Sequence, residues 1–174
     1  MPAPSRSGSI YRATDPMAGG AHCIGQITLD EHTVVRRSAD IEHERATAIF
    51  DLLEENSFVP VADATGPYHL HLAMEGPRLV LDVRGADGQS FDRIALALAE
   101  FRGIIKDYFL VCESYNHAIR NAPLAKITAI DQGRRALHDE ASELLRERLA
   151  AHVAVDFSTA RRLFTLICVL QIRG

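Results

Sequence analysis

The sequence predicts an α+β fold: an antiparallel sheet of four to five strands with about four helices packed mainly on one face. Apolar and polar residues alternate through the middle of the chain, which is typical of strands with one buried face. Apolar residues at helical spacing dominate the remainder. The sequence shows no internal repeat, so the strands and helices are expected to share a single domain over residues 23–174.

The composition is that of an ordinary globular protein. The chain has 174 residues, of which 47% are hydrophobic and 24% charged, enough for one buried core. Its formal net charge of -4 argues against general electrostatic binding to nucleic acid or to an anionic membrane. Only Lys106 and Lys126 are lysines, so nearly all cations are arginines. Arginine suits bidentate contacts with carboxylate or phosphate, although a GC-rich coding bias explains the same excess.

Cysteine usage and hydropathy predict a cytoplasmic protein without a membrane segment. The cysteines, Cys23, Cys112 and Cys168, are odd in number and form no Cys-x-x-Cys motif. The sequence contains neither an apolar run near the ~18 residues that span a bilayer nor the apolar core of a signal peptide. Cys112 and Cys168 lie in apolar helical runs and are expected to be buried. Cys23 is expected to be the most reactive thiol.

The N-terminal part predicts a tail, a strand and a helix. Residues 1–22 are rich in Pro, Ser, Gly and Ala without periodicity, so they are expected to be disordered. A short strand is predicted over residues 24–29. A helix is predicted to begin at Ser38 or Asp40, which are favourable N-cap residues, and to reach about Glu55.

The middle of the chain predicts an antiparallel meander. Residues 58–61 form a short extended run that Pro60 confines to the edge of a sheet. The Asp87-Gly88 pair is a strong hairpin signal. Three longer runs alternate apolar with polar residues: 68–74, 79–84 and 94–98.

The C-terminal half predicts three helices. Residues 101–120 are apolar on nearly every side, which predicts a helix at the centre of the core. Pro123 separates this helix from the next, which is expected over residues 124–151. Asp156 or Ser158 then caps a last helix with an apolar body, which is also expected to be buried.

The first candidate site is the stripe of Asp131, Arg134 and His138, with Glu140 nearby. Helical spacing places the first three on one face, which continues into apolar residues. An imidazole beside a carboxylate can transfer protons, and an arginine can hold an anion. The same residues can be structural, with Asp131 paired to Arg134 and His138 capping or hydrogen-bonding a neighbouring helix.

The second candidate site lies on the polar face of the meander, at His69, His71, Asp82, Arg84 and Arg93. The His-x-His spacing points both rings to one side of a strand, a geometry that metals can use, and Asp82 could add a third ligand. A solvated sheet face explains the same pattern. We predict no metal site and no cofactor.

Signatures of common enzymes are absent from the sequence: there is no Walker loop, dinucleotide-binding glycine motif, zinc-protease motif or nucleophile elbow. Arg161 and Arg162 are expected in the first turn of the last helix, where the helix dipole disfavours cations. We therefore expect carboxylate partners for them, from this chain or from another.

Four segments resemble those of an uncharacterised bacterial protein family, found chiefly in alphaproteobacteria. They are residues 51–56, 101–109, 133–138 and 159–170. The resemblance covers about residues 24–174. The family usually has Asn in place of Asp139 and Gly in place of Ala141. It has no assigned activity, so the resemblance identifies relatives and implies no function.

Two hypotheses about function remain open. The leading one is a non-enzymatic cytoplasmic domain that binds a protein partner or a small regulatory ligand, for which an anion would suit the arginines. The alternative is a small enzyme for an anionic substrate, with His138 as acid–base and Arg134 as anchor. A homo-oligomer is compatible with either. The two differ in whether His138 and Arg134 open into a pocket or are closed off by packing.

Overall fold

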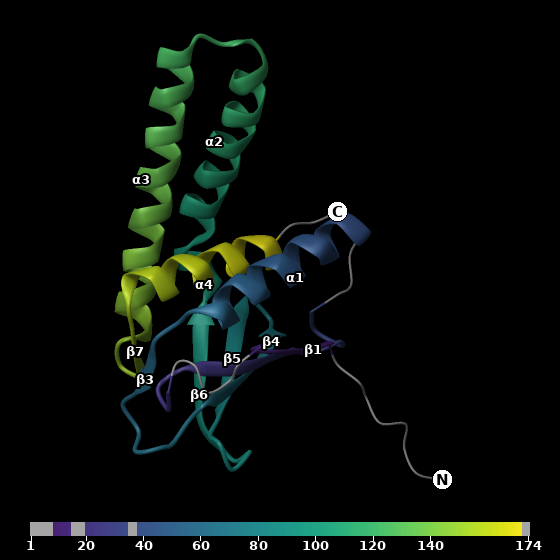
Figure 1. Cartoon of the computed structure of the whole chain (residues 1–174), viewed down its shortest axis with the longest axis vertical. Coiled ribbons are helices and arrows are strands. Elements are labelled where there is room, and N and C mark those ends of the chain that lie inside the picture. Colours follow the sequence, from purple (N-terminus) through teal and green to yellow (C-terminus); the bar gives the residue numbers. More distant parts are fainter. Residues whose placement is uncertain (1–8, 15–19, 35–37, 172–174) are drawn as a thin grey trace.

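A computed structural model describes residues 9–14, 20–34 and 38–171, and these form an α+β fold of two sheets and four α-helices (Figure 1). The strands of the larger sheet, in spatial order, are β1 (Ser9–Arg12), β2 (Ile24–Leu29), β4 (Tyr68–Glu75), β5 (Arg78–Arg84) and β6 (Ser90–Ala97). The smaller sheet pairs β3 (Phe58–Pro60) with β7 (Val153–Val155). The helices are α1 (Ala39–Glu54), α2 (Arg102–Asn121), α3 (Leu124–Leu149) and α4 (Phe157–Leu170), with a 3-10 turn η1 (Leu98–Glu100) before α2. The predicted fold class is confirmed.

The predicted meander is present as β4, β5 and β6, which pair antiparallel. Leu81 of β5 lies between Leu72 of β4 and Ile94 of β6, and all three are buried. Gly88 adopts a φ of 78° in the β5–β6 hairpin, as its tight turn requires. The sheet is mixed rather than wholly antiparallel, because β2 pairs parallel with β4. The chain passes through α1 between these strands, and such a crossover returns it in the same direction.

Helices α1 and α4 lie side by side across the apolar face of the larger sheet (Figure 1). Leucines of the sheet pack against the second half of α3 and against α4, for example Leu72 and Leu81 against Leu145 and Leu166. Local capping sets the first turns of both covering helices. Ser38 caps α1, because its side chain accepts a hydrogen bond from the Ile41 amide. Asp156 caps α4 in the same way.

The cap of α4 is Asp156, whose Oδ1 accepts a hydrogen bond from the Thr159 amide at 2.8 Å.

The predicted edge strand is β3, and its partner β7 was not predicted. Three residues are too few to show alternation, so β7 is recognised only through its pairing. Within the described ranges, none of the helices combines the length and hydropathy needed to cross a bilayer.

Helices α2 and α3 form a hairpin that projects from the body of the molecule (Figure 1). Only Ile105 and Ala118 are buried in α2, so the prediction of a helix at the centre of the core is wrong. The helix packs along α3, but its apolar residues Leu110 and Ile119 are exposed. A buried helix and a helix on a projecting hairpin can share this apolar composition, so only the packing distinguishes them. Cys112 is accordingly half-buried, whereas Cys168 is buried as predicted.

The N-terminal segment departs from its prediction. Residues 9–12 form β1, which pairs antiparallel with β2 over all four positions. Tyr11 and Ala13 pack against the core. The strand is too short to reveal itself by alternation, and its stability depends on the backbone partners that β2 offers. Residues 1–8 and 15–19 of the predicted tail lie outside the described residues.

Candidate functional site

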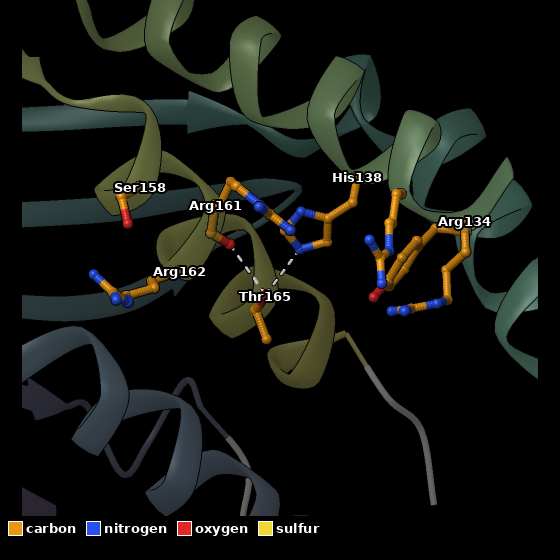
Figure 2. A pocket seen from close by; sticks show the side chains of 8 residues that line it. Arg134, His138, Ser158, Arg161, Arg162 and Thr165 are labelled. Atoms are coloured by element: carbon orange, nitrogen blue, oxygen red, sulfur yellow. Dashed lines mark hydrogen bonds between the residues drawn. The ribbon is translucent and has the colours of Figure 1, made fainter. Parts of the chain in front are cut away.

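A pocket of about 450 Å³ opens between α3 and α4, where the α2–α3 hairpin leaves the body (Figure 2). Its lining comes from three helices: Tyr108 of α2, Arg134, Arg135 and His138 of α3, and Ser158, Arg161, Arg162 and Thr165 of α4. We call it the arginine pocket. Side chains four residues apart share a helix face, which aligns Arg134 with His138 and Arg161 with Thr165. The packing of α3 against α4 then brings the two faces together.

His138 joins the two helices through its ring. Its Nε2 lies 2.9 Å from Thr165 Oγ1, while the Thr165 hydroxyl donates to the Arg161 carbonyl at 3.0 Å (Figure 2). Because a hydroxyl has one proton, Nε2 carries a hydrogen and donates to Thr165. The prediction that His138 would bond a neighbouring helix, if structural, is therefore confirmed.

The second ring nitrogen of His138 also faces the interior. Nδ1 lies 3.5 Å from Ser142 Oγ, whose proton goes to the His138 carbonyl at 2.6 Å. The ring packs edge-on against Tyr108 and Phe164 and is only 6% exposed. Burial, followed by the charges of Arg161 and Arg134, lowers the pKa of His138. The neutral imidazole is therefore the favoured form at neutral pH.

Arg134 is held in place by two contacts. Its Nη2 and Nε atoms donate to Asp131 Oδ1 at 2.6 and 3.1 Å, and its guanidinium lies over the Tyr115 ring, 5.3 Å from the centroid. Arg135 approaches the other oxygen, Oδ2, at 3.0 Å. These hydrogen bonds lower the pKa of Asp131, so one carboxylate serves two guanidiniums. The predicted pair of Asp131 and Arg134 is confirmed.

The two arginines of α4 have looser partners. Arg161 Nε lies 3.6 Å from Asp139 Oδ1, and Arg162 Nη2 lies 3.8 Å from Glu55 Oε2. The Glu55 side chain is 85% exposed, and such ion pairs contribute about 0–1 kcal/mol. Arg162 also donates to the Glu55 carbonyl at 2.8 Å. The expected carboxylate partners thus come from this chain, and a stronger anion can compete with them.

Sequence reasoning found part of this pocket. Arg134 and His138 line the pocket, and Asp131 holds Arg134 in place. Glu140 is exposed and is not among the lining residues. The contributions of Tyr108, Arg135, Ser158 and Thr165 were missed. Arg-Arg pairs on two helices were the available signal, but their proximity depends on how α3 and α4 pack.

Burial raises the pKa of Tyr108 to about 12, so its hydroxyl stays protonated.

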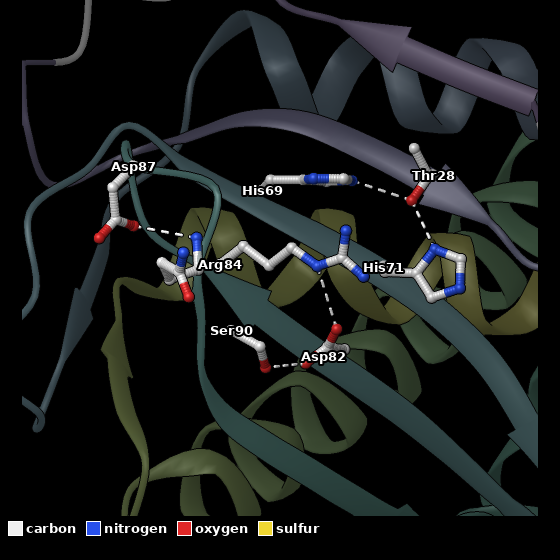
Figure 3. A network of polar contacts seen from close by, with 8 residues as sticks. Thr28, His69, His71, Asp82, Arg84, Asp87 and Ser90 are labelled. Carbon is white, nitrogen blue, oxygen red and sulfur yellow. Dashed lines mark hydrogen bonds and ion pairs between the residues drawn. The ribbon is translucent and has the colours of Figure 1, made fainter.

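The sheet-face candidate is a set of separate contacts rather than one site (Figure 3). His69 Nε2 and His71 Nδ1 lie 2.9 and 2.6 Å from the same hydroxyl, Thr28 Oγ1. Burial, followed by the nearby Arg84, lowers the pKa of His69. Asp82 lies opposite His71 in the sheet register. The two imidazoles therefore share a hydroxyl on β2.

The charged residues of that face are engaged with one another. Asp82 accepts hydrogen bonds from Arg84 at 3.1 Å and from Ser90 (Figure 3). Arg93 bonds to Glu75 instead. In the part of the chain that the structure describes, no group of three His, Cys, Asp or Glu side chains is arranged to hold a metal ion. The arginine pocket is therefore the stronger candidate.

The fold and the pocket together define a small α+β protein with an arginine-lined pocket between two helices. The chain belongs to UPF0262, an uncharacterised protein family whose model matches residues 21–173. Its relatives include a UPF0262 protein of Paramagnetospirillum magneticum, 55% identical over 151 residues, which cover 87% of this chain and 96% of that one.

Further relatives are of similar length. A UPF0262 protein of Erythrobacter litoralis is 52% identical over 88% of this chain and 98% of its own, and one of Rhizobium etli is 49% identical over 91% and 100%. These are alphaproteobacteria, as the resemblance implied. The names of these relatives state no function. No solved structure matches the chain.

Proposed function

We propose that this protein is a non-enzymatic, regulatory binding protein that holds a small anionic ligand in the arginine pocket. The observation that carries the proposal is the convergence of four guanidinium groups, from Arg134, Arg135, Arg161 and Arg162, on one cavity of about 450 Å³. Cavities of this size suit small molecules. Guanidinium groups are planar, permanently charged donors that match the oxygens of anions.

The electrostatics of the pocket support an anion. Arg161 and Arg162 face it with carboxylate partners at 3.6 and 3.8 Å that are largely open to solvent. An anion bound between Arg161 and Arg162 contacts two guanidiniums at once, whereas Asp139 and Glu55 each pair with only one of them.

The position of His138 favours binding over catalysis. A general acid–base needs a ring nitrogen within hydrogen-bond reach of the substrate. Nε2 donates to Thr165 and Nδ1 faces Ser142, so both ring nitrogens already have neighbours within the protein. Arg134 is likewise held by Asp131. The two hypotheses, a binding protein and a small enzyme, require different surroundings for His138 and Arg134. The contacts of these two residues agree better with a binding protein.

The proposal includes a cytoplasmic location, where small anionic metabolites are abundant. Cys112 and Cys168 are free thiols, which supports a reducing compartment. The formal net charge of -4 supports a ligand held locally by the pocket over a general affinity for polyanions. Neither a protein partner nor self-association is required for such binding.

Sulfate is the probe for the test, because it is a dianion at all relevant pH values. We expect it to raise the melting temperature of the wild-type chain in proportion to the occupancy of the pocket. The variant Arg161→Gln should lose this shift. The matched control is Arg120→Gln, which removes the same charge from an exposed position at the end of α2 and should retain the shift. Equal shifts in all three proteins would refute the proposal.

Isothermal titration of the same proteins gives a second readout, because it does not depend on thermal unfolding. Arg161 is 46% exposed, so its substitution should leave the fold intact, as circular dichroism can verify. A bound anion whose chemical turnover is abolished by His138→Gln would support the enzyme alternative instead.

A further inference from the structure

We infer that the anion selected by the arginine pocket is a phosphomonoester group carried by a small molecule. The inference rests on the proposed function and concerns the chemical class of its ligand. It follows from the directions, the charge and the surroundings of the donors.

The donors reach the pocket from two helices. Arg135 comes from α3. Arg161, Arg162 and Ser158 come from α4 (Figure 2). A carboxylate presents two oxygens in one plane, and those of Asp131 are taken by Arg134 and Arg135, which both belong to α3. A phosphomonoester presents three oxygens in a tetrahedral arrangement. It can therefore offer separate oxygens to the donors of the two helices, whereas a lone carboxylate has only two oxygens to share among them.

The charge of the pocket favours a dianion. Asp131 contacts Arg134 and Arg135 at 2.6 and 3.0 Å, so one carboxylate is shared by two guanidiniums and one positive charge is left over at that end of the pocket. The α4 end has the looser contacts, and a ligand that displaces them leaves two guanidiniums to be neutralised. A phosphomonoester carries a charge of about -1.5 to -2 at pH 7, whereas a carboxylate carries only -1.

The start of α4 adds to this preference. Ser158 lies in the first turn of α4 and lines the pocket, so the positive end of the helix dipole is near the ligand. Its hydroxyl can donate a hydrogen bond to an oxygen of the phosphate. Thr165 cannot donate in the same way, because its proton is given to the Arg161 carbonyl.

The surroundings limit the ligand to a single compact anion. On the far side of Arg162 a second hollow is lined by Asp51, Glu54 and Glu55, at the end of α1. These carboxylates would repel a second phosphate group. A nucleic acid strand or an anionic lipid surface extends over many charges and would meet them, whereas a small phosphorylated molecule fits within the cavity of about 450 Å³.

The experiment compares four probes by isothermal titration at constant ionic strength: inorganic phosphate, glycerol 3-phosphate, sulfate and succinate. At pH 7.5 we expect the two phosphates to bind at least about tenfold more tightly than succinate. Tight succinate binding would overturn the phosphomonoester assignment while leaving the proposed anion-binding function in place. If none of the four probes bound, the proposed function itself would fail.

Titration against pH separates phosphate from other anions. The second ionisation of a phosphomonoester has a pKa of about 6, so the dianion falls from nearly all of the ligand at pH 7.5 to about a quarter at pH 5.5. Binding of glycerol 3-phosphate relative to sulfate should therefore weaken about fourfold. The titratable groups around the site, His138, Tyr108, Asp131, Asp139 and Glu55, act on both probes, so the ratio removes their contribution. A constant ratio would contradict binding of the dianion.

A charge-conserving substitution tests the fork geometry. Arg161→Lys keeps the charge but loses the bidentate donor, so we expect glycerol 3-phosphate to bind about tenfold more weakly. Arg120→Lys, at the exposed end of α2, should bind as the wild type does. Unchanged affinity in Arg161→Lys would overturn the assigned geometry. Tighter binding of a 5′-phosphorylated oligonucleotide than of glycerol 3-phosphate would overturn the small-molecule assignment.

Discussion

His138 Nε2 on α3 lies 2.9 Å from Thr165 Oγ1 on α4, and this contact ties the base of the projecting hairpin to the helices that cover the sheet. His138 is also the first buried residue of α3. The arginine pocket lies along the same junction, with Arg134 and Arg135 on one helix and Arg161 and Arg162 on the other. A ligand in the pocket would therefore bridge the hairpin and the body.

The first prediction concerns this hydrogen bond. Thr165→Val leaves the buried Nε2–H of His138 without its partner and should lower the free energy of unfolding by about 1 kcal/mol. Thr128→Val is the matched control, because that exposed hydroxyl likewise donates to a carbonyl four residues earlier, at 2.9 Å from Leu124 O. Urea denaturation should show a change of less than about 0.5 kcal/mol for the control. Equal effects would mean that the His138 contact adds nothing to stability.

The second prediction concerns Arg134. Its side chain is 31% exposed and that of Asp131 is 21% exposed, so the pair is only half-buried. Arg134→Ala removes the stacking on Tyr115, but Asp131 keeps Arg135 at 3.0 Å. We expect a loss of about 1 kcal/mol, below the 3–5 kcal/mol typical of a broken buried pair. Arg135→Ala, at a 68% exposed position, should cost less, and chemical denaturation would rank the two variants. A loss above about 3 kcal/mol would contradict this prediction, because it would mean that the pair of Asp131 and Arg134 is fully buried.

The third prediction concerns thiol reactivity. Cys23 and Cys168 are buried, and burial raises the pKa of the Cys168 thiol to about 12. Cys112 is half-buried on the projecting hairpin and should react first with a thiol reagent in the native state. Because Cys23 is buried, the expectation that it is the most reactive thiol is replaced by this prediction for Cys112. Cys112→Ser should abolish the fast phase and Cys23→Ser should retain it; the reverse pattern would place Cys23 at the surface.

The fourth prediction concerns the N-terminus. Deleting residues 1–13 removes β1 from the edge of β2 together with the contacts of Tyr11 and Ala13 with the core. Full burial of a large apolar side chain contributes about 1.5–3 kcal/mol, and Tyr11 is half-buried, so the deletion should lower the free energy of unfolding by about 1 kcal/mol. Deleting only residues 1–8 leaves β1 in place and is the control. A melting temperature unaffected by the longer deletion would show that β1 contributes no stability.

The fifth prediction concerns pH. Burial, followed by the charges of Arg161 and Arg134, lowers the folded-state pKa of His138, so below about pH 6.5 the unfolded chain binds more protons than the folded one. The stability from His138 is complete above that value and is lost as pH falls toward the lowered folded pKa. Burial, followed by the charge of Arg84, lowers the pKa of His69, which acts in the same direction.

The measurement compares urea midpoints at pH 7.5 and 5.5. His138→Gln should lose less stability on acidification than the wild type does. His43→Gln changes an exposed histidine of α1 and should follow the wild type. If His138→Gln were as sensitive to acid as the wild type, the imidazole would not be held neutral by the fold.

Much of the local structure could be predicted from the sequence. The strand over residues 24–29 has the predicted bounds, and Ser38 and Asp156 cap their helices. The pair of Asp131 and Arg134 was also predicted. Each of these depends on residues at most a few positions apart, where alternation, capping and helical spacing act directly.

The remaining features depend on contacts between distant segments. The parallel pairing of β2 with β4, the strands β1 and β7, and the exposure of α2 all follow from which elements meet in space. The arginine pocket belongs to the same class, because His138 and Thr165 are 27 residues apart in the chain. Sequence alone determined an α+β chain with a polar stripe on α3. Tertiary structure decided that this stripe faces the arginines of α4 across a cavity, because only helix packing sets the distance between side chains on different helices.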